Sequence, residues 1–493
     1  MSASRPHGLS KSRYCTGLQC PRQLWWRTHE PAAPELTPDA AQQAVFDTGS
    51  RVGEVARDHV PGGVLIDRPY QDYAGRLADT QAAIESGART IYEASFSAGG
   101  VFIAADILTH DDDGWRLIEV KSSTQVKPQH LPDAAVQLWV LRQTGLVVKH
   151  VEIMVLDRAC THPDLSNLFQ RVDVTAAVEA LLEGVPEEVT SQLAVLAGPL
   201  PEVTPGPHCR SPYPCPFMER CWPPREEHAL ATLYNSWRAV PGLLDQGYVT
   251  ILDLPAGLQL NAAAERQRRS VQQGGLLIEG DLAGALAAFV PPLAYLDFET
   301  VSPAIPVWPG THPYDAIAVQ FSVHQEDAQG GITHTAWVAT TAGDPRPELA
   351  RRLIAACAGA RAVVAYNAPF EKSCIERLAK ALPQYASALR ELDARIIDLL
   401  PVVRDHVYHP AFGGSFSLKA VLPALVPDLR YDDLVIAEGT AASAALDRLI
   451  FGGDSLDHSE RVALERALLA YCELDTLALV RLLARLREWV AGR

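Results

Sequence analysis

The feature that most constrains the fold is a set of acidic residues at the ends of predicted strands in residues 290–493. The apolar run 293–296 predicts a short buried strand, and Asp297 and Glu299 follow it directly. Because side chains alternate along a strand, these two carboxylates share one face of the sheet. A long amphipathic helix is predicted near the C-terminus, so this region is expected to form an α/β domain.

Further acidic residues follow in the same region. A second apolar strand is predicted over 362–364, and the helix after it bears Glu371. Tyr471 and Asp475 are four residues apart and therefore lie on one face of the final predicted helix. The Asp297 and Glu299 pair at a strand end is well placed to bridge metal ions, and carboxylate oxygens suit Mg²⁺ or Mn²⁺. The alternative is a set of ordinary surface and helix-end acids.

A predicted hairpin near the N-terminal end carries another charged group. Strands are predicted over 101–108 and 115–120, joined by turn residues. Glu119 and Lys121 share one face of the second strand, and Asp106 can reach that face from the first. Two carboxylates and an ammonium at one point could hold a divalent metal and activate water. A surface hairpin with solvated charges is the competing interpretation.

Four cysteines are spaced as one plus three. Cys20 stands far from Cys209, Cys215 and Cys221, which lie in a Pro-rich segment with little apolar periodicity. Thiolates are soft ligands for zinc or iron–sulfur clusters, and the spacing differs from the paired Cys-x-x-Cys motifs usual for zinc. Cys15 is an alternative ligand. The remaining cysteines are interpreted as buried apolar residues: Cys160, Cys357, Cys374 and Cys472.

The hairpin and its flanks resemble the PD-(D/E)XK nuclease fold in its RecB-like and Cas4-like branch, which has Asp, then Glu-x-Lys, then a helix with Gln-x-x-x-Tyr. A helix predicted over 131–141 carries Gln137, but Leu141 stands where the family has Tyr. The resemblance implies that Asp106, Glu119, Lys121 and Gln137 are catalytic. The usual upstream His is absent, and Glu54 or Glu93 would replace it as a metal ligand.

The cysteine spacing also resembles that of Cas4-like nucleases. In that family one N-terminal and three C-terminal cysteines hold a [4Fe–4S] cluster that joins the two ends of the nuclease domain. The resemblance implies the same ligand role for the four cysteines named above, with Zn²⁺ as the alternative.

The C-terminal motifs resemble the DEDD exonucleases, the DnaQ-like branch of the ribonuclease H fold. Segments 397–399 and 417–419 fall where that family has intervening motifs. Glu371 stands where the family has Asp. The resemblance implies 3′-to-5′ exonuclease chemistry at four acids and a tyrosine: Asp297, Glu299, Glu371, Asp475 and Tyr471. The combined pattern is closest to a bacterial family with a RecB-like domain and a domain of unknown function, DUF2779.

We therefore expect a multidomain α/β protein with a PD-(D/E)XK restriction-endonuclease-like domain over 1–225 and a ribonuclease H-like domain over 290–493. Between them, 226–289 reads as a helical connector with turns at 246–248 and 273–275. This connector could present a helix-hairpin-helix to phosphate. The arginines Arg266, Arg268 and Arg269 could form a small basic face, although a solvated helix face is the default.

The composition limits the function classes. Among 493 residues, 43 Lys and Arg against 59 Asp and Glu give a net charge of −16, which argues against coating nucleic acid or membrane by bulk charge. Neither a membrane span nor a secretory signal is visible, so a cytoplasmic protein is expected.

The expected function is a metal-dependent nuclease, exonucleolytic on single-stranded DNA, with two candidate active sites. The alternatives are a nucleic-acid-binding scaffold in which one or both sites are inactive, and an RNA-processing 3′-to-5′ exonuclease. The substituted positions Leu141 and Glu371 favour the scaffold. The aromatic stretch with Trp25 and Trp26 could stack on bases or pack against the cysteines.

Overall fold

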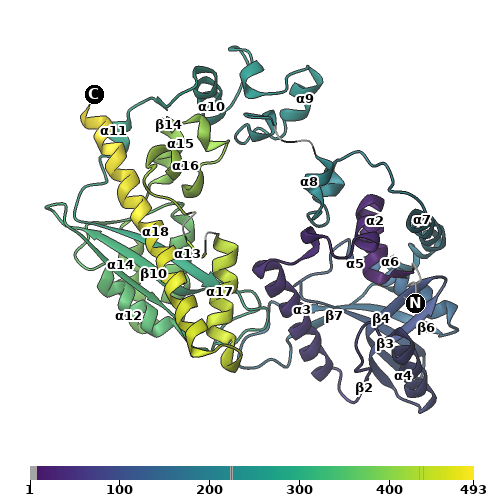
Figure 1. Cartoon of the computed structure of the whole chain (residues 1–493). Coiled ribbons are helices and arrows are strands. Elements are labelled where there is room, and N and C mark those ends of the chain that lie inside the picture. The colour runs from purple at the N-terminus through teal and green to yellow at the C-terminus, as the bar shows by residue number, and fades with distance from the viewer. Residues whose placement is uncertain (1–7, 223, 225, 432–433, 437, 493) are drawn as a thin grey trace. The chain divides into compact units, whose positions relative to one another are not determined.

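The chain folds into two compact units of mixed α/β structure. The computed structural model describes residues 8–222, 224, 226–431, 434–436 and 438–492. Unit 1 comprises residues 1–224 and 303–315, and unit 2 comprises residues 225–302 and 316–493 (Figure 1). The predicted connector, 226–289, lies in unit 2. The expected α/β multidomain class is confirmed.

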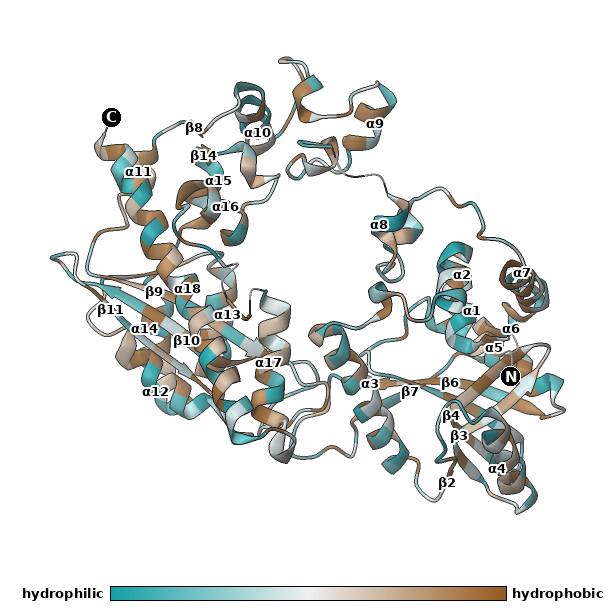
Figure 2. Ribbon diagram, viewed as in Figure 1, coloured by the Kyte–Doolittle hydropathy of each residue, from teal (hydrophilic) through white to brown (hydrophobic). Residues whose placement is uncertain are grey.

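Unit 1 is built on a mixed sheet of order β2-β3-β4-β5-β6-β7, with β1 parallel to β4. The β3–β4–β5 strands form consecutive antiparallel hairpins, and β5 pairs with β6 in parallel across a helical crossover. The inner strands β4 and β6 are buried and mostly hydrophobic (brown in Figure 2). The strands are β1 (Leu9–Ser10), β2 (Val64–Leu65), β3 (Thr90–Ala98), β4 (Val101–Asp111), β5 (Gly114–Lys121), β6 (Val148–Leu156) and β7 (Phe169–Asp173).

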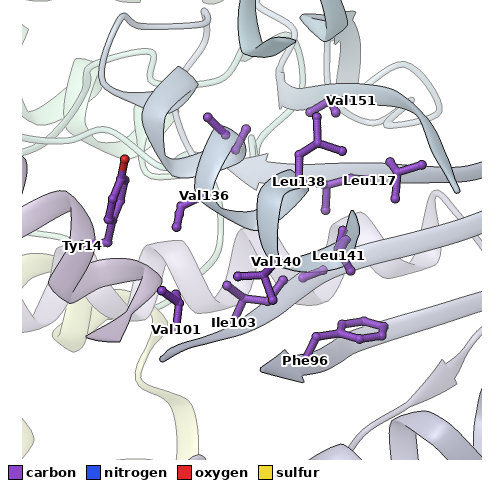
Figure 3. Close-up of a cluster of buried hydrophobic side chains, with 14 of the residues drawn as sticks. Tyr14, Phe96, Val101, Ile103, Leu117, Val136, Leu138, Val140, Leu141 and Val151 are labelled. Carbon is purple, nitrogen blue, oxygen red and sulfur yellow. The ribbon is translucent and has the colours of Figure 1, made fainter. Parts of the chain in front are cut away.

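Helices cover both faces of this sheet. One face packs against α1, α5 and α7, and Figure 3 shows Val136, Leu138, Val140 and Leu141 of α5 lying over strand residues such as Leu117. The other face packs against α3. The helices are α1 (Lys11–Gln19), α2 (Pro21–His29), α3 (Ala40–Asp58), α4 (Tyr73–Glu85), α5 (His130–Gln143), α6 (Thr175–Glu179), α7 (Val185–Ala197) and α8 (Met218–Cys221).

Unit 2 contains a five-stranded sheet of order β11-β10-β9-β12-β13. Helices α12, α13 and α14 pack on the face formed by alternate residues of β9, including Leu296 and Phe298. The opposite face, which carries Asp297 and Glu299, lies against α17 and α18 (Figure 1). The strands are β9 (Leu293–Val301), β10 (Ile317–Glu326), β11 (Ile332–Val338), β12 (Ala362–Ala365) and β13 (Ile396–Asp398).

The α-helices of this sheet domain include one of unusual length. α18 begins at a capping box in which Asp457 and Glu460 satisfy each other's backbone N–H groups. In the part of the chain that the structure describes, no helix is both long and apolar enough to cross a membrane. The helices are α12 (Arg346–Ala356), α13 (Pro369–Ala381), α14 (Ala386–Asp393), α15 (Leu400–His406), α16 (Leu418–Leu425), α17 (Gly439–Phe451) and α18 (His458–Ala491).

A smaller helical part of unit 2 precedes the sheet. It contains α9 (Val240–Asp245), α10 (Ala262–Gln273) and α11 (Leu282–Ala285), and β8 (Leu277–Ile278) pairs with β14 (Val407–Tyr408). The default expectation of a solvated basic face on α10 is wrong. Arg266 and Arg268 are buried and pair with Glu279 and Glu265, so their charges stabilise this fold.

Candidate functional sites

Asp106 of β4 turns toward Glu119 because the ladder between β4 and β5 ends just before it. The last backbone pair is Ile107 with Ile118. Beyond it, Oδ2 of Asp106 accepts a hydrogen bond of 2.8 Å from the backbone N–H of Val120. The carboxylate therefore replaces a backbone acceptor and satisfies a buried donor.

Glu119 is the centre of the group that we call the hairpin site: Asp106, Glu119 and Lys121. The Glu119 side chain is 1% exposed and accepts hydrogen bonds from Lys121 Nζ at 2.7 Å and from Gln137 Nε2 at 2.7 Å. Lys11, from the first turn of α1, donates to both of its oxygens at 2.9 and 3.1 Å. The buried carboxylate thus has three polar partners.

Lys11 also contacts Asp106. Its Nζ lies 3.6 Å from Asp106 Oδ1, so one ammonium bridges the two carboxylates. Burial, then the neighbouring Glu119, raises the pKa of Asp106 to about 7. Burial alone would raise the pKa of Glu119, but Lys11 and Lys121 together hold it well below its usual range. The position between the carboxylates, where a divalent ion would be held, is filled by the protein's own cation.

A further acid lies beside the hairpin site. Asp133, on α5, accepts a hydrogen bond of 2.5 Å from Lys121 Nζ. Burial raises the pKa of Asp133, and Glu119 raises it further. Two ammonium groups therefore face three carboxylates, and this near balance leaves little uncompensated negative charge for a metal ion.

The two proposed replacements for the missing histidine lie differently. Glu93, on β3, has a positive φ of 57° opposite the Asp106 region, and it pairs with the buried Arg76 at 3.3 Å. Its charge contributes to the raised pKa of Asp106. Glu54 is exposed and pairs with Arg51 on α3, which packs on the other face of the sheet.

The four cysteines predicted as ligands line one small cavity in unit 1. Cys20 begins α2, and its partners come from the segment around α8. The pKa of the Cys215 thiol is raised, chiefly by burial. A hydrogen bond from the Phe217 backbone lowers this pKa in part, and the nearby thiols of Cys20, Cys209 and Cys221 raise it further. Thiols held together in this way are deprotonated readily when a metal binds them.

The surroundings of the cysteines suit a negatively charged metal–thiolate group. Arg22 donates to Cys221 Sγ at 3.8 Å, and a hydrogen bond to sulfur stabilises thiolate charge. Trp26 is buried and packs on Phe217 at 5.0 Å between ring centroids. Trp26 therefore packs beside the cysteines, in agreement with the packing alternative for this residue. Cys15 is absent from this cavity's lining.

In unit 2, three carboxylates converge, and we call them the carboxylate trio: Asp297, Glu299 and Asp475. One oxygen from each lies within 4.8 Å of the others. The strand alternation of β9 places the first two on one face, and α18 crosses that face with Asp475. Tyr431 donates a hydrogen bond of 2.5 Å to Asp475, and Cys472 donates one of 3.4 Å to Asp297.

The trio carries negative charge that its neighbours compensate only in part. Burial, then Asp475, raises the pKa of Glu299 to about 8, and burial raises that of Asp475 to about 6. Burial and the other two acids raise the pKa of Asp297 further. Like charges gathered in a buried place are stabilised by a bound divalent cation, and all-oxygen donors suit Mg²⁺ or Mn²⁺.

Glu371, the fourth predicted acid, is outside this trio. It lies near the start of α13, is 2% exposed, and its Oε2 has no hydrogen-bond partner in the structure. Burial raises its pKa to about 8, and its charge also raises that of Asp297. Because its charge acts on Asp297, Glu371 would add negative charge near a cation that the trio holds.

The trio opens into a cavity of about 550 Å³, within the size range of ligand pockets. Its aromatic lining comes from Tyr234, Tyr366, Phe416 and Tyr471. Lys419 Nζ donates to Tyr471 Oη at 2.9 Å and supplies a positive charge. Aromatic faces, a cation and carboxylates together match the chemistry of a nucleotide: a base, a phosphate and phosphate-bound metal.

Several site residues escaped the sequence reasoning. Lys11 and Tyr431 are brought in by long-range packing, and no local motif marks them. Asp133 had a readable signal, because it lies one helical turn before Gln137 on the same helix. Asp398 lies in a segment that the resemblance marked, and its carboxylate accepts the N–H groups of Asn367 and Ala368 at the turn leading into α13.

Comparison with family models finds one matching segment, most of which lies in unit 2, whereas its residues 303–315 belong to unit 1. Residues 294–417 match the family described as Domain of unknown function (DUF2779), which is about a quarter of the chain. The matched segment contains the strand half of the trio and Glu371, whereas Asp475 follows it. No curated protein matches the chain.

Proposed function

We propose that this protein is a metal-dependent nuclease that hydrolyses phosphodiester bonds at the carboxylate trio, acting as an exonuclease on single-stranded DNA. The observation that carries the proposal is the convergence of three partly buried carboxylates, each with a raised pKa, at an aromatic-lined cavity. The resemblance to DEDD exonucleases supports 3′-to-5′ polarity. A cavity of this size with an aromatic lining suits one or a few nucleotides at a strand end.

The charged residues and two tyrosines in and beside the pocket have separate roles under this proposal. Asp297, Glu299 and Asp475 would hold Mg²⁺ or Mn²⁺. Glu371 would add negative charge near Asp297. The bound ions would supply an activated water and neutralise charge on the leaving oxygen. Tyr431 holds the Asp475 carboxylate by its hydrogen bond. Tyr471 would orient the water, and Lys419 would attract the phosphate.

We propose that the hairpin site is inactive as it stands. Its acids are satisfied by Lys11, Lys121 and Gln137, so the donor set does not fit a divalent cation in this arrangement. No step of hydrolysis is therefore assigned to it. This assignment agrees with the alternative in which one of two nuclease-like sites is inert.

The cysteines fit a metal–thiolate group, and we propose a [4Fe–4S] cluster at Cys20, Cys209, Cys215 and Cys221, with Zn²⁺ as the alternative. Such a group would join α2 to the α8 segment. It supplies structure, since the cavity that the sulfurs line is enclosed by side chains such as Trp26 and Phe217.

The test is a cleavage assay on the full chain with 5′-labelled and 3′-labelled single strands of DNA and RNA, in Mn²⁺, Mg²⁺ or chelator. Asp297→Asn is expected to lower the rate by about 100-fold or more, because one metal ligand is lost. Asp106→Asn should leave the rate near that of the wild type. Glu376→Gln, which alters a half-exposed acid on α13, is the matched control.

Four results would contradict these assignments. The enzyme proposal is overturned if no substrate is cleaved in either metal, or if Asp297→Asn cleaves at the wild-type rate. Loss of cleavage in Asp106→Asn alone would transfer the activity to the hairpin site. Faster cleavage of RNA than of DNA would replace the substrate class by RNA.

A further inference from the structure

We propose that His324, His334 and Glu473 form a second metal site in unit 2, of the class that binds Zn²⁺ and similar transition-metal ions. The three residues come from β10, β11 and α18. One ligand atom from each lies within 4.8 Å of the others. This donor set of two imidazoles and one carboxylate differs from the all-oxygen trio.

The two imidazoles are placed by the register of the sheet. His324 and His334 are directly opposite each other in the antiparallel pair of β10 and β11. Side chains at such positions point to the same face and lie close together. The rings stack with centroids 4.4 Å apart and an interplanar angle of 30°. The backbone therefore holds two nitrogen ligands side by side before any ion binds.

Glu473 completes the group from the helix above. Its Oε1 lies 3.6 Å from His334 Nδ1. Glu473 and His334 are exposed, whereas His324 is buried, so the group has one covered side and one open side. Three protein ligands with an open fourth position are the arrangement of many zinc sites that also bind water.

Buried hydroxyls orient both rings, and this observation is independent of the ligand distances. Thr476 Oγ1 lies 2.8 Å from His324 Nδ1, and Ser322 Oγ lies 2.9 Å from His334 Nε2. The two hydroxyls are themselves 2.7 Å apart, and both side chains are fully buried. One nitrogen of each ring is engaged in this way, which leaves His324 Nε2 and His334 Nδ1 as the ligand atoms.

Outer partners of this kind are what metal-binding histidines use, because they set the tautomer and the direction of the ring. An imidazole binds an ion through the lone pair of one ring nitrogen, and the two hydroxyl contacts leave one nitrogen of each ring for this role. Nitrogen ligands favour zinc-class ions over Mg²⁺, which prefers oxygen. The trio and the histidine site should therefore select different ions.

The site also has a structural consequence. An ion held by β10, β11 and α18 would fasten the long helix to the open edge of the sheet. Ser322 pairs with Asp297 across β9 and β10, and Thr476 follows Asp475 on α18. The hydroxyls that orient the histidines therefore lie next to trio residues, one across the β-ladder from Asp297 and one adjacent to Asp475 in the chain.

The test is Co²⁺ binding to the full chain, followed by its visible absorbance and by equilibrium dialysis. Because the cysteines and the trio can also bind Co²⁺, the quantity compared is the difference between variants. Wild type is expected to bind one more Co²⁺ per chain than His334→Ala, with absorbance that lacks sulfur-to-metal bands. Thr476→Val should weaken this binding by about 10- to 100-fold.

His458→Ala, which removes an exposed histidine at the start of α18, is the matched control and should bind as wild type does. Equal Co²⁺ uptake by wild type and His334→Ala would overturn the site. Equal losses in His334→Ala and His458→Ala would also overturn it, as non-specific surface binding. Neither outcome concerns cleavage at the trio, so failure of this proposal is distinguishable from failure of the nuclease proposal.

Discussion

At the scale of single residues, the two acidic groups differ in how their charge is balanced. In the hairpin site, Lys11 contacts Asp106 and Glu119 and takes the position of a counter-ion. In the trio, burial and then Asp475 raise the pKa of Glu299, burial raises that of Asp475, and Lys419 offsets both increases only in part. Both sites contain Asp and Glu, so residue type alone does not distinguish the hairpin site from the trio.

Lys11→Met tests this difference. Removing one partner of a buried charge group leaves the other charges unpaired, which we expect to lower the free energy of unfolding of unit 1 by about 2–4 kcal/mol in chelator. Mn²⁺ should then bind between the two carboxylates and restore part of that stability. The measurement is denaturant unfolding with and without Mn²⁺.

Mn²⁺ can stabilise the wild type through the trio, so the control is the double variant Lys11→Met with Asp106→Asn. The extra stabilisation by Mn²⁺ should disappear in it. If Lys11→Met unfolds at the wild-type denaturant concentration, or gains no more from Mn²⁺ than the wild type does, the counter-ion role of Lys11 is wrong.

Part of each site could be predicted at this scale. Strand alternation placed Glu119 beside Lys121, and Asp297 beside Glu299, because the period of two is a local property of the backbone. Lys11 and Tyr431 could not be predicted in the same way. Each reaches its site from a distant segment, and only the tertiary packing of α1 or of the loop before α17 brings it there.

At the scale of elements, helix α5 contributes one residue to the hydrophobic core and another to the hairpin site. Leu141 is fully buried in the core beneath this helix, among residues such as Phe96 and Leu117 (Figure 3). Gln137, one turn earlier, instead donates to Glu119. The Tyr that the resembled family has at this position would therefore need space that the core does not offer.

Leu141→Tyr is accordingly expected to lower the free energy of unfolding by about 1–3 kcal/mol, because overpacking a dense core forces side chains to shift. It should bring no gain in cleavage. Leu141→Met, which keeps the volume, is the control and should cost less. Urea unfolding measures both, and an unchanged or higher stability of Leu141→Tyr would show that the core has room.

Elements differ in how readable they were. The strands around Asp106 and Asp297 and the helices α5 and α18 were predicted because their apolar periodicity is strong. For the polar helix α10, the prediction of a solvated face was wrong. Its arginines are buried through ion pairs with Glu265 and Glu279, and charge alone does not reveal burial when the partner is elsewhere in the chain.

At the scale of the whole chain, the candidate groups are divided between two units. The cysteines and the hairpin site belong to unit 1, and the trio and the histidine group belong to unit 2. Composition could indicate several domains but not that residues 303–315 return to unit 1. Contacts such as the hydrogen bond from Tyr314 Oη to the carbonyl of Ser122 hold that segment in unit 1. No local sequence pattern predicts this contact.

This division leads to the prediction for Cys20→Ser. A metal group that joins Cys20 to Cys209–Cys221 closes a very long loop, so its loss should lower the stability of unit 1 by about 5 kcal/mol in the chain-entropy description. The variant should lose iron, or zinc in the alternative, and its visible absorbance after anaerobic purification. Cleavage by the trio should persist, since every trio residue is in unit 2.

Cys160→Ala is the matched control, because Cys160 is equally buried in unit 1 but packs with Leu156 and Leu168 away from the other four cysteines. It should keep its metal. A wild-type chain that binds neither iron nor zinc would remove the metal–thiolate group. Full metal content in Cys20→Ser would instead show that the fourth ligand is a residue other than Cys20. The first candidate to test is Cys15, five residues earlier on α1.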